Sequence, residues 1–439
     1  MFAVRESCLR RWLWGFCGGM DAKLQVKKVS GIPVEVLNGL SNAGSILSLI
    51  AQEIAVSRPA LQAHTGLSRV TVTQRVNALL GAGLICESDD MQATGGRPSR
   101  VLALNAACGY VLVANIGETQ IQLAMLTATA AMIAQSTCAR QADAAPEHTL
   151  QQIADGFEAL CRDHAGGVAG QMLLAISLSL PAPVDYENCR VYGPSVLPGW
   201  EDLDIAGFFS QRFTAPVYGE NDVNAMTLHQ HRACFATEPN LVFIKAGTGI
   251  GSGIISQNRL LRGARGVAGD IGHIQMRAGL GKDTLLQCRC GKTGCVEAQA
   301  AGWALARDLT NAGTPAKTAR DVMAAFTMNQ PLALDLVAQS GRILGDVIAG
   351  MISVLNPGCI VIGGTLAGAG DVLLNGIRQQ VAQQCLPAAT QNLRICAAPP
   401  ARQSELFGAA LLALEDVFSS RQVEGTLIRF AQWSLRAMV

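Results

Sequence analysis

Three cysteines near the middle of the chain form a compact group of potential metal ligands. Cys288, Cys290 and Cys295 lie in the segment Cys-Arg-Cys-Gly-Lys-Thr-Gly-Cys, and His273 lies upstream of them. Three thiolates and one imidazole make a closed tetrahedral zinc site of the structural kind. The glycines between the cysteines permit the tight turns that would direct all three sulfurs at one ion. We therefore predict a structural Zn2+ held by these four residues, the alternative being three unrelated cysteines.

The composition limits the class of protein. A chain of 439 residues is long enough for two or three domains. Its net charge of +1 provides no overall attraction to nucleic acid or membranes, so any basic surface has to be local. No apolar run reaches the length of a membrane span, since the nearest candidate, residues 345–364, contains Asp346, Asn356 and Pro357. The 14 cysteines are scattered rather than arranged as a secreted disulfide framework, which indicates a reducing, cytoplasmic location.

The leader, residues 1–41, has no clear domain pattern. Arg5, Arg10 and Arg11 precede an apolar stretch that is too short for the core of a signal peptide. Two interpretations stay open: translation starts at Met20, or the leader is a disordered basic arm.

Residues 42–105 have the pattern of a winged helix-turn-helix. Apolar residues at helical spacing predict three helices, of which the second and third are capped by Ser57 and Ser68. Two strands, beginning at Leu84 and Arg100, flank a Gly-Gly-Arg-Pro tip. The apolar stripe of the first predicted helix consists of Ile46, Leu49, Ile50 and Ile54.

Polar side chains of the third helix and the tip are suited to contact DNA. Such a helix enters the major groove, and a basic tip contacts phosphate or the minor groove. The predicted DNA contacts are Ser68, Arg69, Thr71, Thr73, Gln74, Arg75, Arg97 and Arg100. One unit reads few base pairs, so we expect a homodimer or a dimer of dimers on operator DNA. A winged helix that binds protein is the alternative.

Beyond this unit the chain contains two similar strand–turn–strand segments. The first runs from Tyr110 to Leu126, and the second runs from Leu241 to Ile255 through a glycine-rich turn at 247–253. This repetition predicts a duplicated α/β domain with a cleft between its lobes. We assign the first lobe to residues 106–222, completed by C-terminal helices at about 400–439, and the second lobe to residues 223–399.

Several hydroxyl-binding side chains follow predicted strands or flank the cysteine segment. These candidate sugar ligands are Asn221, Asp222, Asp270, His273 and Glu297. Acceptors and an imidazole that converge on a cleft suit a sugar. The alternative is that Asp222 and Asp270 are ordinary helix caps.

Six segments in this order resemble the ROK family of repressors, open reading frames and kinases. The resemblance extends from about Asn42 to the C-terminus. The segments are Gly95–Pro98, Pro194–Trp200, Glu220–Asp222, Gly247–Gly251, Gly269–His273 and Cys288–Glu297. The resemblance implies a two-lobed, actin-like ATPase fold of the ribonuclease-H type. It also implies zinc on the three cysteines and His273, and a sugar bound by Asn221, Asp222, His273 and Glu297. In the family's kinases, the residue matching Asp222 takes the proton from the sugar hydroxyl.

Two residues depart from the first phosphate turn of the kinase pattern. Asn115 stands where these kinases have an aspartate of the first phosphate turn, and Glu118 replaces a glycine. A carboxylate at this point repels a triphosphate, so we expect no kinase activity.

Together these features predict a sugar-responsive DNA-binding transcriptional regulator, a repressor of carbohydrate-metabolism genes, whose effector is a sugar or sugar phosphate. The first alternative is a ROK-type sugar kinase with an appended DNA-binding module. The second is a zinc-stabilised adaptor that binds a partner protein.

Overall fold

The structure is a computed structural model that describes residues 36–37, 39–92, 99–141, 144–193, 197–201, 203–276 and 286–436. The leader lies almost wholly outside these residues, and so does Arg97. Within the described part of the chain, no helix combines the length and apolar character needed to cross a membrane.

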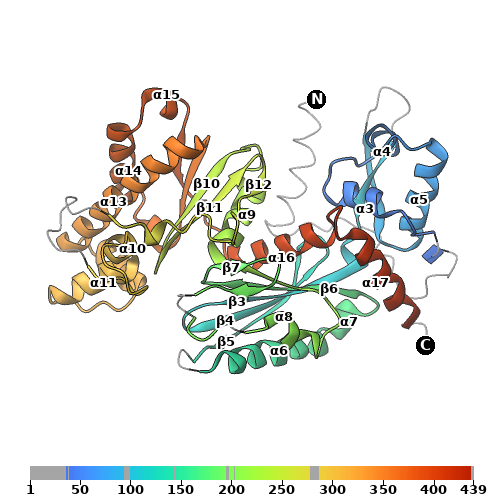
Figure 1. Cartoon of the computed structure of the whole chain (residues 1–439), viewed down its shortest axis with the longest axis horizontal. Helices are drawn as coiled ribbons and strands as arrows, with labels where there is room; N and C mark the ends of the chain where they lie inside the picture. The colour runs from blue at the N-terminus through green and yellow to red at the C-terminus, as the bar shows by residue number, and fades with distance from the viewer. Residues whose placement is uncertain are drawn as a thin grey trace.

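In the residues that the structure describes, the N-terminal unit contains three helices and a pair of strands (Figure 1). Its elements are α3 (Gly44–Ala51), α4 (Arg58–Thr65), α5 (Arg69–Gly81), β1 (Ile85–Gln92) and β2 (Ser99–Leu104). The two strands pair in antiparallel fashion.

The caps of these helices follow the sequence prediction. Ser57 accepts a hydrogen bond from the backbone N–H of Ala60 at the start of α4, and Ser68 accepts one from Thr71 at the start of α5. Gly66 ends α4 with a positive φ of 70°, a conformation that glycine adopts without steric cost. One prediction is wrong: Ile54 is 53% exposed, because α3 ends before it at Ala51.

The first of two five-stranded sheets follows directly. Its strands are β3 (Gly109–Ile116), β4 (Gln120–Thr127), β5 (Met132–Ala139), β6 (Met172–Leu180) and β9 (Val217–Asn221). They lie in the order β5-β4-β3-β6-β9, with antiparallel pairs on the β5 side of β3 and parallel pairs on its β9 side.

Helices cover both faces of this sheet, which explains why its strands are almost continuously apolar. Val111 and Val113 face the core shared with the C-terminal helices, whereas Leu112 and Ala114 face α6. The covering helices are α6 (Pro146–Asp163) and α8 (Ile205–Ser210) on one side and α16 (Ser404–Val417) on the other. The smaller elements of this region are α7 (Ala165–Val168), β7 (Val184–Asp185) and β8 (Arg190–Val191).

The second sheet repeats the topology of the first. Its strands are β10 (Leu241–Ala246), β11 (Ile250–Ser256), β12 (Arg259–Leu260), β13 (Cys359–Gly363) and β14 (Arg394–Ala397). The strands lie in the order β12-β11-β10-β13-β14. The pairs on the β12 side of β10 are antiparallel and those on its β14 side are parallel, as they are around β3 in the first sheet. This agreement confirms the predicted duplication of an α/β arrangement.

A second core lies between this sheet and a group of helices. The helices in this part of the chain are α9 (Asp222–Cys234), α10 (Glu297–Ala300), α11 (Gly302–Asn311), α12 (Ala319–Thr327), α13 (Pro331–Leu355), α14 (Asp371–Gln384) and α15 (Pro387–Thr390). Helix α9 connects the two sheets, since it begins where β9 ends and leads to β10.

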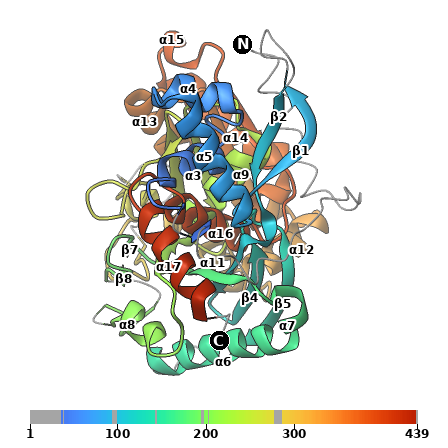
Figure 2. The ribbon, with the colours of Figure 1, turned by 90° about the vertical axis from the view of Figure 1, so that its right-hand side faces the viewer.

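The C-terminal helix α17 (Val423–Arg436) joins the N-terminal unit to the first sheet, as Figures 1 and 2 show. Ile46 of α3, Leu412 of α16 and Phe430 of α17 belong to one continuous buried core. The carboxylate of Glu424 also accepts a hydrogen bond of 3.2 Å from the backbone N–H of Gly44. The described N-terminal unit and helix α17 are therefore packed as one body.

Candidate metal and sugar site

The four predicted zinc ligands lie together. The ligand atoms of His273, Cys288, Cys290 and Cys295 are all within 4.8 Å of one another. The sulfurs of Cys290 and Cys295 are 3.7 Å apart, and the sulfur of Cys288 is 3.7 Å from Nδ1 of His273. A tetrahedral zinc with bonds of about 2.3 Å to sulfur places its sulfur ligands about 3.8 Å apart, so this donor set fits zinc.

The local backbone explains why the cysteines converge. Gly291 and Gly294 both have a φ of 84°, so each turns the chain in a conformation that favours glycine. Two isolated β-bridges then hold this segment. The bridge between Gln287 and Thr293 lies within the segment, and the bridge between Gln275 and Cys295 joins it to the stretch after His273. We call residues 286–296 the knuckle.

The predicted sugar ligands surround one hairpin, the turn between β10 and β11. Val223, next to Asp222, packs closely on this hairpin. A methyl group added to Gly251 of the hairpin would lie only 2.9 Å from Cγ2 of Val223. Gly272, next to His273, packs on the backbone of Ile250 in the same way. Glu297 approaches from the knuckle side, and its Oε2 accepts a hydrogen bond of 3.0 Å from the N–H of Ile250.

Asp270 also lies beside this hairpin. A methyl group on the preceding Gly269 would meet the backbone carbonyl of Ser252, and Gly269 has a φ of 93°. Asp270 is exposed and caps no backbone N–H, so its predicted alternative role as a helix cap is wrong.

Asn221, rather than Asp222, is the cap of α9. Its Oδ1 accepts from the N–H groups of Val223 and Asn224, and its Nδ2 donates to the carbonyl of Ala182 at 3.1 Å. These bonds fix the start of the helix. The carboxylate of Asp222, in the first turn of α9, is thereby held at the end of the first sheet.

Lys245 forms an ion pair with Asp222 that the sequence did not reveal. Its Nζ lies 2.5 Å from Oδ2 of Asp222, and the two side chains are 24% and 11% exposed. Burial acts to lower the pKa of Lys245, but the attraction of Asp222 outweighs it, and the net effect raises that pKa. The lysine is therefore charged at neutral pH.

A second ion pair involves Glu220, two residues before Asp222. Glu220 is 1% exposed and accepts from Nε of Arg262 at 2.6 Å and from Nδ2 of Asn224 at 2.9 Å. The guanidinium of Arg262 also stacks over Tyr186 at 3.9 Å. This arrangement stabilises the end of β9, next to Asn221 and Asp222 in the chain.

The hairpin of β3 and β4 contains the two departures noted in the sequence, with Asn115 in β3 and Glu118 in the turn. Asn115 donates from Nδ2 to Oε1 of Gln122 across the hairpin at 3.0 Å. The carboxylate of Glu118 forms an ion pair of 3.3 Å with Arg289 of the knuckle. Arg140 donates to the carbonyls of Gly117 and Glu118, both at 3.3 Å, and so fixes the turn. Glu118 thus links the first sheet to the knuckle, a role that its position in the sequence does not reveal.

Comparison with known proteins identifies the family. A model of the ROK family matches residues 111–416, well over half of the chain. The chain belongs to the ROK family. It is 25% identical to the xylose repressor of Bacillus spizizenii over 375 residues, which cover 85% of this chain and 95% of the repressor. It is 30% identical to the glucokinase of Halalkalibacterium halodurans over 288 residues, which cover 62% of this chain and 85% of the kinase.

A solved structure has a similar arrangement over nearly the whole chain. The crystal structure of a ROK family transcriptional regulator, a homologue of the Escherichia coli MLC protein, superposes with a TM-score of 0.73 at 26% identity. The similarity covers 90% of this chain and 99% of that regulator. The α/β architecture described above is therefore that of the ROK fold.

The predicted DNA contacts of this ROK protein lie at the start of α5 and on its outer side. Arg69 and Gln74 are exposed, whereas Val72, Val76 and Leu79 are buried in the core. Ser68 and Thr71 share a hydrogen bond of 2.9 Å at the cap, and Thr73 bonds to the carbonyl of Arg69. Thr71, Thr73 and Arg75 are partly buried.

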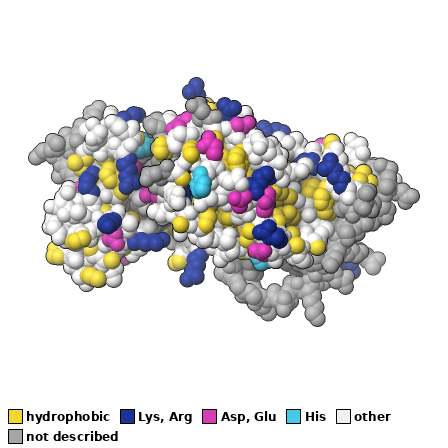
Figure 3. Space-filling view, turned by 90° about the horizontal axis from the view of Figure 1, so that it is seen from below, with side chains coloured by type: hydrophobic (Ala, Val, Ile, Leu, Met, Phe, Trp, Pro, Cys, Tyr) yellow, Lys and Arg dark blue, Asp and Glu magenta, His cyan; other side chains and the backbone are white. Residues whose placement is uncertain are grey.

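Arg100, another predicted DNA contact, is 61% exposed and forms an ion pair of 3.4 Å with Glu87, which also pairs with Arg58 at 2.7 Å. On the face shown in Figure 3, basic and acidic side chains are interspersed. That distribution agrees with the small net charge of +1.

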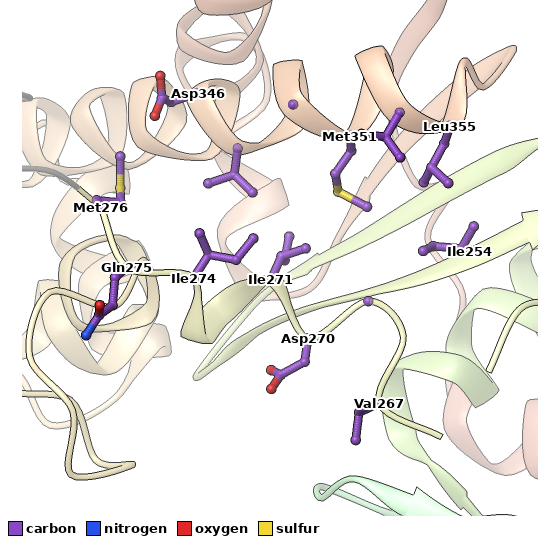
Figure 4. A pocket seen from close by; sticks show the side chains of 14 residues that line it. Ile254, Val267, Asp270, Ile271, Ile274, Gln275, Met276, Asp346, Met351 and Leu355 are labelled. Carbon is purple, nitrogen blue, oxygen red and sulfur yellow. The ribbon is translucent and has the colours of Figure 1, made fainter. Parts of the chain in front are cut away.

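An apolar pocket lies on the other side of the segment that contains Asp270. It has a volume of about 890 Å³ and lies against α13. In Figure 4 Ile271 and Ile274 point toward Met351 of α13, whereas the carboxylate of Asp270 points away from them. The pocket and the candidate sugar site therefore share Asp270, which lines the pocket together with Ile271 and Ile274.

Proposed function

We propose that this protein is a sugar-responsive transcriptional repressor that binds operator DNA through its N-terminal unit. The observation that carries the proposal is the extent of the similarity. The xylose repressor matches 85% of the chain, whereas the glucokinase matches 62% of it. The three helices and hairpin also share a buried core with the sheet that leads to the candidate sugar site. We take residues 42–105 as a winged helix-turn-helix in which α5 enters the major groove.

Sugar would bind beside the hairpin between β10 and β11. We assign its hydroxyl groups to Asp222, Asp270, His273 and Glu297, with Asn221 holding Asp222 in place. Zn2+ would be held by His273 and the three cysteines, where it supplies a rigid tetrahedral link and no reaction step. Nδ1 of His273 faces Cys288, which leaves Nε2 to contact the sugar or Asp270.

Binding would alter the spacing of two N-terminal units in a dimer. Half-sites lie a fixed distance apart, so a modest movement weakens operator binding. The sugar changes DNA affinity only to the extent that it prefers one of the two arrangements.

The experiment begins with selection of duplexes from a random-sequence pool by the zinc-loaded protein. The affinity for a selected duplex is then measured by fluorescence anisotropy with and without a panel of sugars and sugar phosphates. We expect at least one compound to change this affinity. If no DNA sequence is enriched, the proposed recognition of DNA is wrong. If no compound changes the affinity for the selected duplex, the proposed sugar response is wrong.

The role of α5 is tested in the same assay. Arg69→Ala and Gln74→Ala should each weaken binding by about 1–3 kcal/mol if they contact base edges. Arg162→Ala provides the control, because this arginine is 73% exposed on α6, outside the N-terminal unit. Unchanged affinity in both α5 variants would favour a protein-binding role for the unit.

A sugar kinase is the second candidate, favoured by the similarity to glucokinase. Against it are the amide of Asn115, the carboxylate of Glu118 and the ammonium of Lys245 held on Asp222. A carboxylate already paired with an ammonium is a weak proton acceptor. Sugar-dependent release of ADP at about 1–100 per second, ordinary for kinases, would overturn the choice of a repressor without enzymatic activity.

A further inference from the structure

Val70 is an exposed apolar side chain on the helix that is proposed to enter the major groove. It is the second residue of α5 and is 66% exposed. Among the described residues, it belongs neither to the buried core of the N-terminal unit nor to the side chains that pack against that core. A valine does not favour this helix either, because a β-branched residue has a lower helix propensity than alanine. Its side chain is therefore available to a partner.

Val70 lies on the side of α5 opposite the core. Successive residues of a helix are about 100° apart, so residues separated by four and seven positions share a side. The buried side of α5 consists of Val72, Val76 and Leu79. The exposed stripe on the opposite side consists of Val70, Gln74, Asn77 and Gly81. In Figure 1, α5 lies at the outer edge of the N-terminal unit, on the side away from the second sheet.

The surroundings of Val70 favour DNA over an apolar partner. Helix α5 contains Arg69 and Arg75 and no acidic residue. Gln74, one turn after Val70, has an amide that suits the edge of an adenine. A protein helix docks through several apolar anchors, and this stripe has only one. The floor of the major groove matches the stripe better, because it combines hydrogen-bonding base edges with one apolar group, the C5 methyl group of thymine.

We propose that Val70 contacts the C5 methyl group of a thymine in the major groove and makes operator recognition depend on that base. This inference rests on the proposed function, because it names the part of the DNA that one residue of α5 reads. The N-terminal residues of a recognition helix contact base edges, and Val70 lies in the first turn of α5. A cytosine at the same place has no methyl group, so the contact distinguishes the two pyrimidines.

The test removes the methyl group from the DNA. Each thymine of a duplex selected by the zinc-loaded, full-length protein is replaced singly by deoxyuridine, which lacks the C5 methyl group and forms the same base pair. Fluorescence anisotropy then measures the affinity for each modified duplex. We expect at least one replacement to weaken the binding of the wild type about fourfold, the effect of leaving one methyl-sized group unburied.

Variants of Val70 identify the side chain responsible. Val70→Ala removes both methyl groups of the valine and should lose most of the fourfold difference between thymine and deoxyuridine. The ratio of the two affinities is the readout, so a general loss of DNA binding does not imitate the effect. Val354→Ala is the matched control, because this valine of α13 is 82% exposed and lies outside the N-terminal unit. The control should keep the full difference.

The outcomes separate this inference from the proposed function. A wild type that is insensitive to every replacement overturns the inference and leaves a DNA-binding repressor intact. A difference that persists undiminished in Val70→Ala also overturns it, because another group then reads the methyl group. Thermal unfolding of Val70→Ala should show undiminished stability, and a marked loss would show that Val70 packs within the protein instead. Failure of the wild type to select any sequence contradicts both proposals.

Discussion

Three of the candidate ligands, Asp222, His273 and Glu297, depend on neighbours that hold them in place. Asn221 positions Asp222, Ile250 and Trp303 donate to the two oxygens of Glu297, and the knuckle holds His273. The site is thus built from side chains whose orientations are already determined before a ligand arrives, which lowers the entropic cost of binding.

Removing one zinc ligand should disturb the whole knuckle. Cys290→Ser should bind markedly less zinc, because three ligands hold the ion more weakly than four. Bound zinc is measured by mass spectrometry after dialysis. Cys138→Ser is the matched control, since this half-buried cysteine of β5 is outside the cluster. One zinc per chain in Cys290→Ser would show that the site is misassigned.

Two buried histidines of α9 should make the protein acid-sensitive. Burial lowers the pKa of His229 and of His231 to about 4 from 6.5. Folding therefore favours their neutral forms, so the stability they contribute is complete above pH 6.5 and is lost as the pH falls toward 4. Between pH 7 and pH 5 each should reduce the free energy of unfolding by about 2 kcal/mol.

Urea unfolding at the two pH values measures this loss. His229→Leu removes one titrating group and should lose less stability than the wild type on acidification. An equal loss in both proteins would contradict the assignment of this histidine.

At the scale of elements, the contact between α9 and α16 is unusually close. A methyl group on Gly408 of α16 would clash with the backbone carbonyl group of Ala225 in α9. Gly408→Ala should force the two helices apart and lower stability by about 1–3 kcal/mol. Gly425→Ala in α17 is the control, because no atom lies within 4 Å of its added methyl group. That variant should be neutral or stabilising, as alanine favours helices.

Unfolding monitored by circular dichroism compares the two variants. Equal stability of Gly408→Ala and the wild type would show that the helices are less tightly packed than described here.

The ion pair between Glu118 and Arg289 joins the first hairpin to the knuckle. Both side chains are nearly half exposed, at 47% and 44%, so the pair should contribute only about 0.2–1 kcal/mol. Glu118→Arg and Arg289→Glu should each be destabilising, and the double variant should recover most of the loss. A double-mutant cycle of thermal unfolding measures this coupling. Additive effects would show that the two residues do not interact.

Local features of these elements were predictable, whereas contacts between distant elements were not. The caps at Ser57 and Ser68 and the grouping of the three cysteines depend on residues close in sequence, and His273 is the more distant member of that cluster. The pairing of Lys245 with Asp222 and of Glu118 with Arg289 depends on how the two sheets are placed. A charged residue at the end of an apolar strand, such as Lys245, was the available signal for the first of these pairs.

At the scale of the whole molecule, one chain of packed helices connects the candidate sugar site to the N-terminal unit. Helix α9 begins with Asp222 and packs on α16, and α17 packs on α3. Their buried side chains belong to a single core. Proximity alone does not demonstrate coupling, so this connection has to be tested by substitution.

Glu424→Ala should weaken this connection. The variant loses the hydrogen bond to Gly44, so a sugar or sugar phosphate that changes operator affinity in the wild type should change it less. Affinity for that compound itself should stay the same. Anisotropy and calorimetry measure the two quantities, with Glu147→Ala on α6 as an exposed control. An unaltered response in Glu424→Ala would exclude this contact as part of the coupling.

The common core of the two chain ends has a consequence for engineering. A hybrid regulator that received only residues 39–105 from another protein would place foreign side chains against α16 and α17. A transplantable DNA-reading module therefore has to include residues from both termini, even though they are hundreds of positions apart along the polypeptide.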